Sequence, residues 1–427
     1  MDKIPAEVAF IIIDNVSKRD LKSLRFLSKY FNTMVSLSLF KQVFVSVHLM
    51  DLDVLVAIAK HPSLRFVVHE FIYSGVYFRK CLVTEHAGSF TFANRYYHTR
   101  WTEQEETRRS GEDLAIISSA LTAMPNVRKI TFTNHWLPVH ESDRNGYEKA
   151  FGAIDKEITY TKSGGPLGRA YPPFVKKPKG FLLRVYDAGN HPIWIDHGFQ
   201  VMCRALSISG RKIEDISMNY YTGYIGGPNP NTGFAAASFL SSPRAFQHAF
   251  ATFKNLRKLS FCYQPALGDL NILQNGCIAK VLAAAINLEE LNIDFNYCYP
   301  GARLSHFIGT STWPCLHTLR LFQQDIQAAE LVGRLSRHCN TLKALELSCI
   351  QLAGGTWLEV GLQLRNMGWR CLKSVTCEDV VEEDRTKRIW WLELENCILG
   401  HDFNQIYAVD DSSAHSDAET ENHNDGQ

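Results

Sequence analysis

The chain has 427 residues, of which 45% are hydrophobic and 21% are charged, and its formal net charge is +1. This composition is typical of a globular protein with one large domain or two to three ordinary domains. The near-neutral charge gives no global field that would attract nucleic acid or an acidic membrane. No run approaches the roughly 20 consecutive apolar residues that a membrane-spanning helix needs. We therefore expect no nucleic-acid partner and no membrane partner.

The first residues of the chain predict a helix rather than an export signal. Pro5 suits the first helical position, where its missing N–H group costs nothing, and Glu7 lies in the first turn, where the helix dipole favours negative charge. Asp2, Glu7 and Asp14 interrupt the apolar run, which argues against a secretory signal. The apolar stripe of this helix consists of Val8, Ile11, Ile12 and Val16.

A second helix is predicted after a short break. Ser17 and Asp20 have the spacing of a helix-capping pair. The residues expected on one side of this helix are Leu21, Leu24, Leu27, Phe31 and Met34. Ser38 is predicted to begin a third short turn with Leu39, Phe40 and Val43. Three short helices cannot form a large core of their own, so a segment that is apolar on several faces indicates a partner.

The 11 cysteines are scattered and form no Cys-x-x-Cys pair. The closest couple, Cys371 and Cys377, is too widely spaced for a zinc knuckle. We therefore expect reduced cysteines, no metal site and no cofactor, in a cytoplasmic and/or nuclear protein.

A leucine-rich pattern recurs from Phe253 onward. Each copy contains L-x-x-L-x-L or a close variant, and the first leucines are 32, 28 and 26 residues apart. The copies are FKNLRKLSFCYQ (253–264), AINLEELNIDFN (285–296), WPCLHTLRLFQQ (313–324) and CNTLKALELSCI (339–350). A weaker copy begins at Leu372, and others lie at 212–220 and 126–134. The segment 63–71 fits the pattern more loosely. Such a fixed recurrence predicts a repeat architecture.

Helical periodicity precedes several of these copies, at 110–124, 275–286 and 325–339. Each unit is thus predicted to be a helix, a turn and a strand of about four alternating residues, giving an α/β fold with a parallel sheet. The pattern resembles the leucine-rich-repeat family in its irregular variety. This resemblance implies a solenoid with parallel strands on the concave face and helices on the convex face. A doubly wound α/β domain is the alternative.

Two long irregular insertions interrupt the repeat, near residues 138–200 and 220–240, and both are rich in Gly, Pro and Tyr. No phosphate-binding, zinc-protease or serine-hydrolase motif occurs in the chain. The segment 187–197 concentrates Asp187, His191 and His197. An enzyme site there is an alternative hypothesis, although we prefer a loop with satisfied polar groups and expect no pocket.

The N-terminal segment resembles an F-box motif. Its opening is Ile4-Pro5-Ala6-Glu7, and its break is Lys18-Arg19-Asp20-Leu21. Its middle is Leu27-Ser28-Lys29-Tyr30-Phe31, and its end is Leu39-Phe40-Lys41-Gln42-Val43. Lys18 and Ser28 depart from the family's frequent Pro and Cys. An F-box followed by irregular leucine-rich repeats is similar to the architecture of fungal-type F-box domain-containing proteins.

The resemblance implies an F-box at 1–47 and the repeat domain with its insertions at 48–400. The acidic composition of residues 409–427, which contain no aromatic residue and no aliphatic anchor after Val409, predicts a disordered tail. The resemblance also implies a non-enzymatic substrate-recognition subunit of a cullin–RING (SCF-type) ubiquitin ligase. The partners would be a Skp-type adaptor, cullin through that adaptor, and an unidentified protein substrate. The residues implied in the adaptor interface or the small core behind it are Ile4, Pro5, Glu7, Val8, Ile12, Leu21, Leu24, Leu27 and Phe31. A repeat scaffold without a ligase role, whose N-terminal helices only cap the solenoid, is the alternative.

Overall fold

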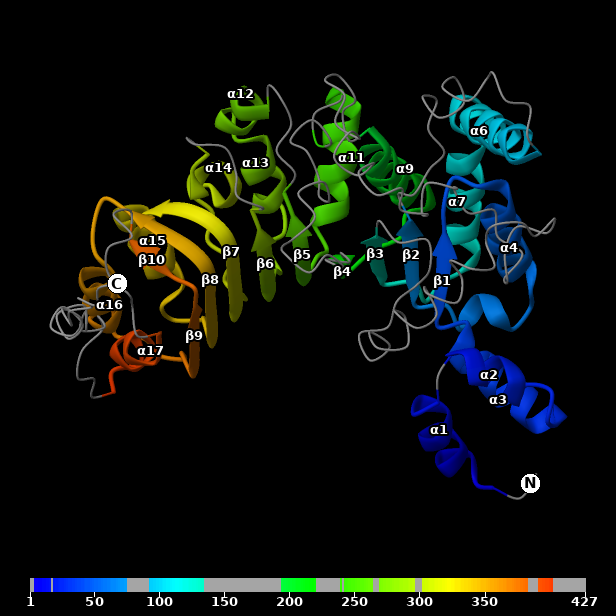
Figure 1. Cartoon of the computed structure of the whole chain (residues 1–427), viewed down its shortest axis with the longest axis horizontal. Helices are drawn as coiled ribbons and strands as arrows, with labels where there is room; N and C mark the ends of the chain where they lie inside the picture. The colour runs from blue at the N-terminus through cyan, green and yellow to red at the C-terminus, as the bar shows by residue number, and fades with distance from the viewer. Residues whose placement is uncertain are drawn as a thin grey trace, which may run out of the picture. The chain divides into compact units, whose positions relative to one another are not determined.

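The computed structural model describes residues 4–16, 18–74, 92–133, 193–219, 239, 242–263, 269–295, 302–382 and 391–401 (Figure 1). The protein is α/β with parallel strands, as the repeat pattern predicts. It comprises two compact units, Met1–Cys315 (unit 1) and Leu316–Gln427 (unit 2). No helix within these described ranges combines the length and the apolar character needed to cross a bilayer. The acidic tail lies outside the described residues.

Unit 1 begins with three helices: α1 (Ala6–Asp14), α2 (Lys18–Leu24) and α3 (Lys29–Leu39). The prediction of one second helix reaching Met34 is wrong, because the chain turns between Leu24 and Lys29. Ser28 is the N-cap of α3, and its Oγ accepts a hydrogen bond from the Phe31 N–H group. A capped helix start satisfies an orphan backbone donor. Ser17, the predicted cap of the second helix, lies outside the described residues.

The predicted third turn from Ser38 is not formed. Ser38 belongs to the last turn of α3, and Val43 lies in the first strand. Unit 1 continues with six parallel strands that pair in chain order. They are β1 (Gln42–Val45), β2 (Glu70–Ser74), β3 (Lys129–Thr133), β4 (Asp215–Asn219), β5 (Lys258–Cys262) and β6 (Glu290–Asp294).

The alternation of the strands explains their packing. In β5 and β6, Leu259, Phe261, Leu291 and Ile293 are buried, whereas Lys258 and Glu290 on the other face are not. The loose copy at 63–71 is displaced in the structure, because Leu64–Phe66 form a 3-10 turn. The buried positions that correspond to the pattern there are Val68, Phe71 and Tyr73.

A row of helices accompanies the strands of unit 1. The helices are α4 (Leu49–Lys60), α6 (Phe92–Ser110), α7 (Glu112–Ala123), α9 (Ile193–Ser209), α11 (Pro243–Phe253), α12 (Asp269–Gln274), α13 (Cys277–Ala283) and α14 (Leu304–Ile308). Contacts run in chain order from α4 to α7, α9, α11, α13 and α14, and Figure 1 shows α9, α11 and α13 on one side of the strands. A doubly wound sheet would instead reverse its strand order. The helices predicted at 110–124 and 275–286 are confirmed as α7 and α13.

Unit 2 repeats the alternation of strands and helices, and two of its strands are longer. Its elements are β7 (Thr318–Gln327), α15 (Ala328–Leu335), the 3-10 turn Ser336–His338, β8 (Ala344–Ala353), α16 (Trp357–Arg365), β9 (Ser374–Glu378), β10 (Val381–Glu382) and α17 (Trp391–Leu399). Strand β8 pairs in parallel with β7 on one side and with β9 and β10 on the other.

The expectation of four-residue strands is wrong for β7 and β8, which have ten residues each. Residues 325–327, predicted to begin a helix, extend β7 and pair with Gln351 to Ala353. The cause is a bulge in both strands, because Gln323 and Cys349 adopt left-handed backbone conformations with φ of 58° and 53°. The bulge shifts the alternation by one residue, so that pairing continues beyond it.

Helix α17 covers the free side of β9. The Ser374 N–H group donates to the Lys343 carbonyl across the β8–β9 pair. Since N–H directions alternate along a strand, the Cys377 N–H group points away from β8. There it donates to Glu395 Oε1 of α17 at 2.7 Å. Arg365 of α16 also donates hydrogen bonds to the carbonyls of Gly400 and His401, which follow the C-terminus of α17.

Candidate functional site

The three N-terminal helices share a core of their own. The buried members of this cluster are Ala9, Ile13, Leu21, Phe31, Met34 and Val35. The half-buried residues packed against it are Ile4, Phe10, Val16, Leu24, Tyr30 and Leu39. Tyr30 also donates its hydroxyl to the Ile4 carbonyl at 3.0 Å, which fixes the chain entering α1 to α3. All members of the cluster therefore come from residues 4–39.

Helix α1 is apolar on a second face as well. Ala9 and Ile13 point into the core, whereas Val8, Ile11 and Ile12 are exposed. The exposed three have the i, i+3, i+4 spacing of one helix face. Burying such side chains stabilises a protein by about 1.5–3 kcal/mol each, so an exposed apolar face is suited to a partner.

The turn between α2 and α3 adds two further exposed apolar side chains, Phe26 and Leu27. We call the five residues of α1 and this turn the apolar patch. Their exposed fractions are 44% for Val8, 64% for Ile11, 40% for Ile12, 90% for Phe26 and 58% for Leu27. Contiguous exposed apolar surface is characteristic of an interaction site, and three of these five side chains share one face of α1.

The structure divides the nine residues that the F-box resemblance implies. Those in the core or packed against it are Ile4, Leu21, Leu24 and Phe31. Those exposed to solvent are Pro5, Glu7, Val8, Ile12 and Leu27. The second group, and the exposed parts of the half-buried Ile4 and Leu24, can contact another protein without unfolding the helices.

Two residues of the apolar patch, Ile11 and Phe26, are missing from the set drawn from the sequence. Ile11 is on the predicted stripe but does not match a position of the quoted motif. Phe26 is not among the residues predicted for the apolar side of the second helix, and the prediction places it inside that helix rather than in a turn. The sequence signal that locates the break is Ser28, a strong N-cap residue.

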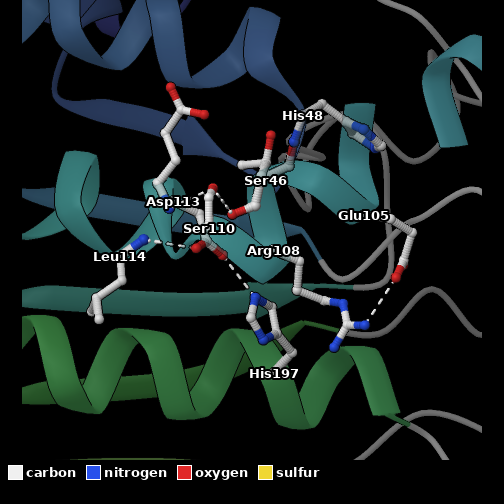
Figure 2. Close-up of polar contacts among 10 residues, drawn as sticks. Ser46, His48, Glu105, Arg108, Ser110, Asp113, Leu114 and His197 are labelled. Atoms are coloured by element: carbon white, nitrogen blue, oxygen red, sulfur yellow. Dashed lines mark hydrogen bonds and ion pairs between the residues drawn. The ribbon is translucent and has the colours of Figure 1, made fainter. Parts of the chain in front are cut away.

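A polar contact also joins α7 to α9 (Figure 2). His197 Nε2 lies 2.7 Å from Asp113 Oδ2, and Asp113 is only 1% exposed. The next residue, Gly198, packs so closely on the Tyr73 ring that a Cβ atom there would overlap it. Burial raises the pKa of Tyr73, and the charge of Asp113 raises it further. These contacts fix the start of α9 against α7 and β2.

The hypothesis of an enzyme site at 187–197 gains no support from His197. Its contact with Asp113 joins two packed helices, while Asp187 and His191 lie outside the described residues. Burial raises the pKa of Cys203 to about 12 and also raises the pKa of Cys377. Both thiols are therefore protonated at neutral pH and weakly nucleophilic. Within the described ranges, no group of three or more His, Cys, Asp or Glu residues is placed to hold a metal ion.

The exposed face of the unit 1 sheet carries a charge ladder, defined as Glu70, Lys129, Asp215, Lys258 and Glu290. These residues occupy one register position on five successive strands. Along this row, acidic and basic side chains alternate. The nitrogen of Lys129 is 3.7 Å from carboxylate oxygens of both neighbours, Glu70 and Asp215. Lys258 pairs with Glu290, which raises the Lys258 pKa. Opposite charges across strands favour this register.

Residues that directly precede charge-ladder residues in the chain also form pairs of opposite charge. Arg128 lies 3.5 Å from Glu214, and Arg257 lies 2.5 Å from Glu289. The hydrogen bond that Arg257 donates to the Glu289 carboxylate is the main cause of the raised Arg257 pKa. Unit 1 thus neutralises the charges of its own sheet face.

The corresponding positions of unit 2 do not alternate. Lys343 and Lys373 are adjacent, because the Lys373 N–H group donates to the Lys343 carbonyl. Neither lysine forms an ion pair with a described residue. The exception to this arrangement is Arg320, which lies 2.9 Å from Glu346 on the adjoining strand.

A scan against protein-family models gives no match, and a search of curated proteins gives none either.

Proposed function

We propose that this protein is a substrate-recognition subunit of a cullin–RING (SCF-type) ubiquitin ligase. Helices α1 to α3 would form its F-box and bind a Skp-type adaptor, and the strands and helices that follow would form a leucine-rich-repeat solenoid that binds a protein substrate. The observation that carries the proposal is the apolar patch, the exposed apolar side chains of α1 and of the α2–α3 turn in a segment that already has a core.

The ordered motif pieces of the sequence support the F-box part of the proposal. The helix boundaries agree with a three-helix module, and Ser28 is an effective N-cap although it departs from the motif. The position of the other departure, Lys18, is the first residue of α2.

The strand order supports the solenoid part. Each L-x-x-L-x-L copy supplies one parallel strand, and the strands of each unit pair in chain order. The first leucines of the four clear copies, Leu256, Leu288, Leu316 and Leu342, are fully buried. Such units cannot cover their apolar faces alone and are stabilised by their neighbours.

The experiment is a binding assay between the full chain and a purified Skp-type adaptor. We expect the wild-type chain to form a complex and the double variant Ile11→Glu with Phe26→Glu to bind at least thirtyfold more weakly, since losing a central apolar anchor costs about 2 kcal/mol or more. The matched control is Ile286→Glu, which also charges an exposed isoleucine (61% exposed) but lies outside the apolar patch. It should bind normally.

Circular dichroism and thermal unfolding of each variant guard against misfolding. Because Ile11 and Phe26 are exposed, the variants should unfold at the wild-type temperature. If the wild-type chain does not bind the adaptor, the ligase proposal fails. If the double variant binds like the wild type, the apolar patch is not the interface.

A repeat-type interaction scaffold with no ubiquitin-ligase role is the second candidate. It is favoured by the direct passage from α3 to β1, with only Phe40 and Lys41 between them, which suits a cap on the first strand. For this function the double variant would leave partner binding by the repeats unchanged, and no adaptor complex would form with any variant.

A further inference from the structure

The sheet face of unit 2 contains a buried hydroxyl group without a partner. Ser348 of β8 is two residues beyond Glu346, so both side chains lie on the same face of the strand. The intervening Leu347 is fully buried on the other face. Ser348 is only 6% exposed, and its Oγ forms no hydrogen bond within the described part of the chain. A buried polar atom that forms no bond destabilises the fold, so its retention requires a reason.

The neighbours of Ser348 in the sheet are known from the register. Phe322 of β7 lies on one side of it and Glu378 of β9 on the other. The residue that follows each of these three in the chain has a left-handed backbone: Gln323 in β7, Cys349 in β8 and Asp379 directly after β9, with φ of 58°, 53° and 50°. This conformation is strained for residues other than glycine, and strained backbone is concentrated at functional sites.

Glu378 lies at this register position and Asp379 follows it, whereas Asp325 pairs with Gln351, three residues beyond Ser348. Glu378 and Asp379 are exposed, and so is Asp325, which follows the bulge of β7. None of the three forms an ion pair with any residue that the structure describes. We call Asp325, Glu378 and Asp379 the acidic bulge. It contrasts with the charge ladder of unit 1, where each carboxylate has a cationic neighbour.

The groups without partners share one chemical requirement. Gln323 follows Phe322 in β7, and its Oε1 is buried and accepts no hydrogen bond from a described residue. An amide oxygen and carboxylate oxygens can only accept hydrogen bonds, and a serine hydroxyl can accept them as well. A ligand that satisfies this set must therefore be rich in donors and positively charged. Lysine and arginine side chains have donors and no acceptors.

We propose that the acidic bulge, together with Ser348 and Gln323, binds a basic segment of the protein substrate, with its lysine or arginine side chains on Glu378 and Asp379. That the ligand is a ligase substrate rests on the proposed function. That the ligand is basic follows from the side chains of unit 2 alone. Ser348 and Glu378 are register neighbours on β8 and β9, so a segment that contacts both would cross these strands.

The test measures the anisotropy of two fluorescein-labelled peptides with the full chain at low salt. One peptide has twelve residues alternating Lys and Ser, and the other replaces each Lys with Glu. We expect saturable binding of the Lys peptide and at least tenfold weaker binding of the Glu peptide. Glu378→Gln with Asp379→Asn should weaken binding of the Lys peptide about tenfold, while Asp53→Asn on the exposed face of α4, the matched control, should leave it unchanged.

Ser348→Ala separates a binding role from a structural one. Removing an unpaired buried hydroxyl should raise the thermal unfolding temperature. If Ser348 contacts the ligand, the same variant should also weaken binding of the Lys peptide severalfold. Unaltered binding by both the acidic-bulge variant and Ser348→Ala, or equal binding of the two peptides by the wild type, would overturn the proposal.

The adaptor assay on the same preparations distinguishes the two proposals. The acidic-bulge variants should still bind the adaptor, because the apolar patch is intact. If the Lys peptide binds as expected but no adaptor complex forms, the ligase proposal fails and the basic-segment site remains. If the adaptor binds but the Lys peptide does not, this inference alone fails.

Discussion

The two units use the same strand pattern but treat charge in different ways. In unit 1, each ionised group of the charge ladder faces an opposite charge on the next strand, as Lys129 does between Glu70 and Asp215. In unit 2, Lys343 and Lys373 are adjacent, and Glu378 and Asp379 have no cationic partner among the described residues. Compensated charges across strands help to fix the register of a sheet, whereas like charges oppose it. The charged side chains of the unit 1 ladder therefore neutralise one another, whereas the unpaired charges of unit 2 are suited to a charged ligand.

The two units also differ in their backbone conformation. Among the described residues of unit 1, positive φ angles occur only at glycines, whereas unit 2 has three non-glycine residues in this conformation. The strands of unit 1 have four or five residues, and the bulged strands β7 and β8 have ten. Unit 2 thus combines backbone strain, unpaired polar atoms and uncompensated charge in one place.

The largest expected effect compares one helical glycine from each unit. Gly198→Ala in α9 should destabilise the protein by about 3 kcal/mol, because the new methyl group overlaps the buried Tyr73 ring. Gly333→Ala in α15 has no atom within 4 Å of the new methyl group and should stabilise by up to about 1 kcal/mol. Denaturant unfolding of both variants measures the difference. Equal effects would contradict the close packing of α9 on β2.

A smaller effect tests the strain in unit 2. Gln323→Gly should stabilise the protein by about 1 kcal/mol, since glycine adopts the left-handed conformation without a steric cost. The unit 1 control is Ser260→Gly in β5, at an ordinary strand position, which should destabilise by about 0.5–1 kcal/mol. Opposite signs in chemical denaturation would support the bulge. A loss of stability in both variants would mean that Gln323 is not strained.

The smallest effect concerns the charge ladder. Burial raises the pKa of Asp215, and Lys129 only partly opposes this. The folded state therefore binds this proton more tightly than the unfolded state, and the contribution of Asp215 to stability falls as pH rises through the carboxyl range. Asp215→Asn should gain about 0.5 kcal/mol at pH 7 and lose this gain near pH 3, where the carboxyl group is protonated in both states.

The matched control for Asp215→Asn is Glu214→Gln, one residue earlier and 45% exposed in its ion pair with Arg128. It should show no gain at either pH. Urea unfolding at both pH values measures these differences. A loss of stability for Asp215→Asn at pH 7 would show that the attraction to Lys129 and Lys258 exceeds the cost of burial.

The parallel strands and the buried leucines could be predicted from the sequence. Leu256 and Leu288 recur in one phase with an apolar residue three and five positions later, and such a pattern suits a strand buried on one face. The bulges could not be predicted in this way. Gln323 and Cys349 are not residues that favour positive φ, so nothing local distinguishes them from ordinary strand residues.

Much the same holds for the candidate site. The motif pieces indicated α1 and the importance of Val8 and Ile12, but periodicity through Leu24, Leu27 and Phe31 suggested one helix where there are two. The apolar phase continues across the break, and only the cap residue Ser28 marks it. The contact between Asp113 and His197 joins residues 84 positions apart, and such a pairing depends on packing between α7 and α9 that no local pattern encodes.

Glu395 has a consequence for how this protein behaves at high concentration. A strand from another molecule that paired with β9 at Cys377 would have to supply a carbonyl to its N–H group, and Glu395 Oε1 already occupies that position. An open strand edge is a template for aggregation. By occupying this donor and covering β9, α17 makes the addition of another strand at this edge less favourable.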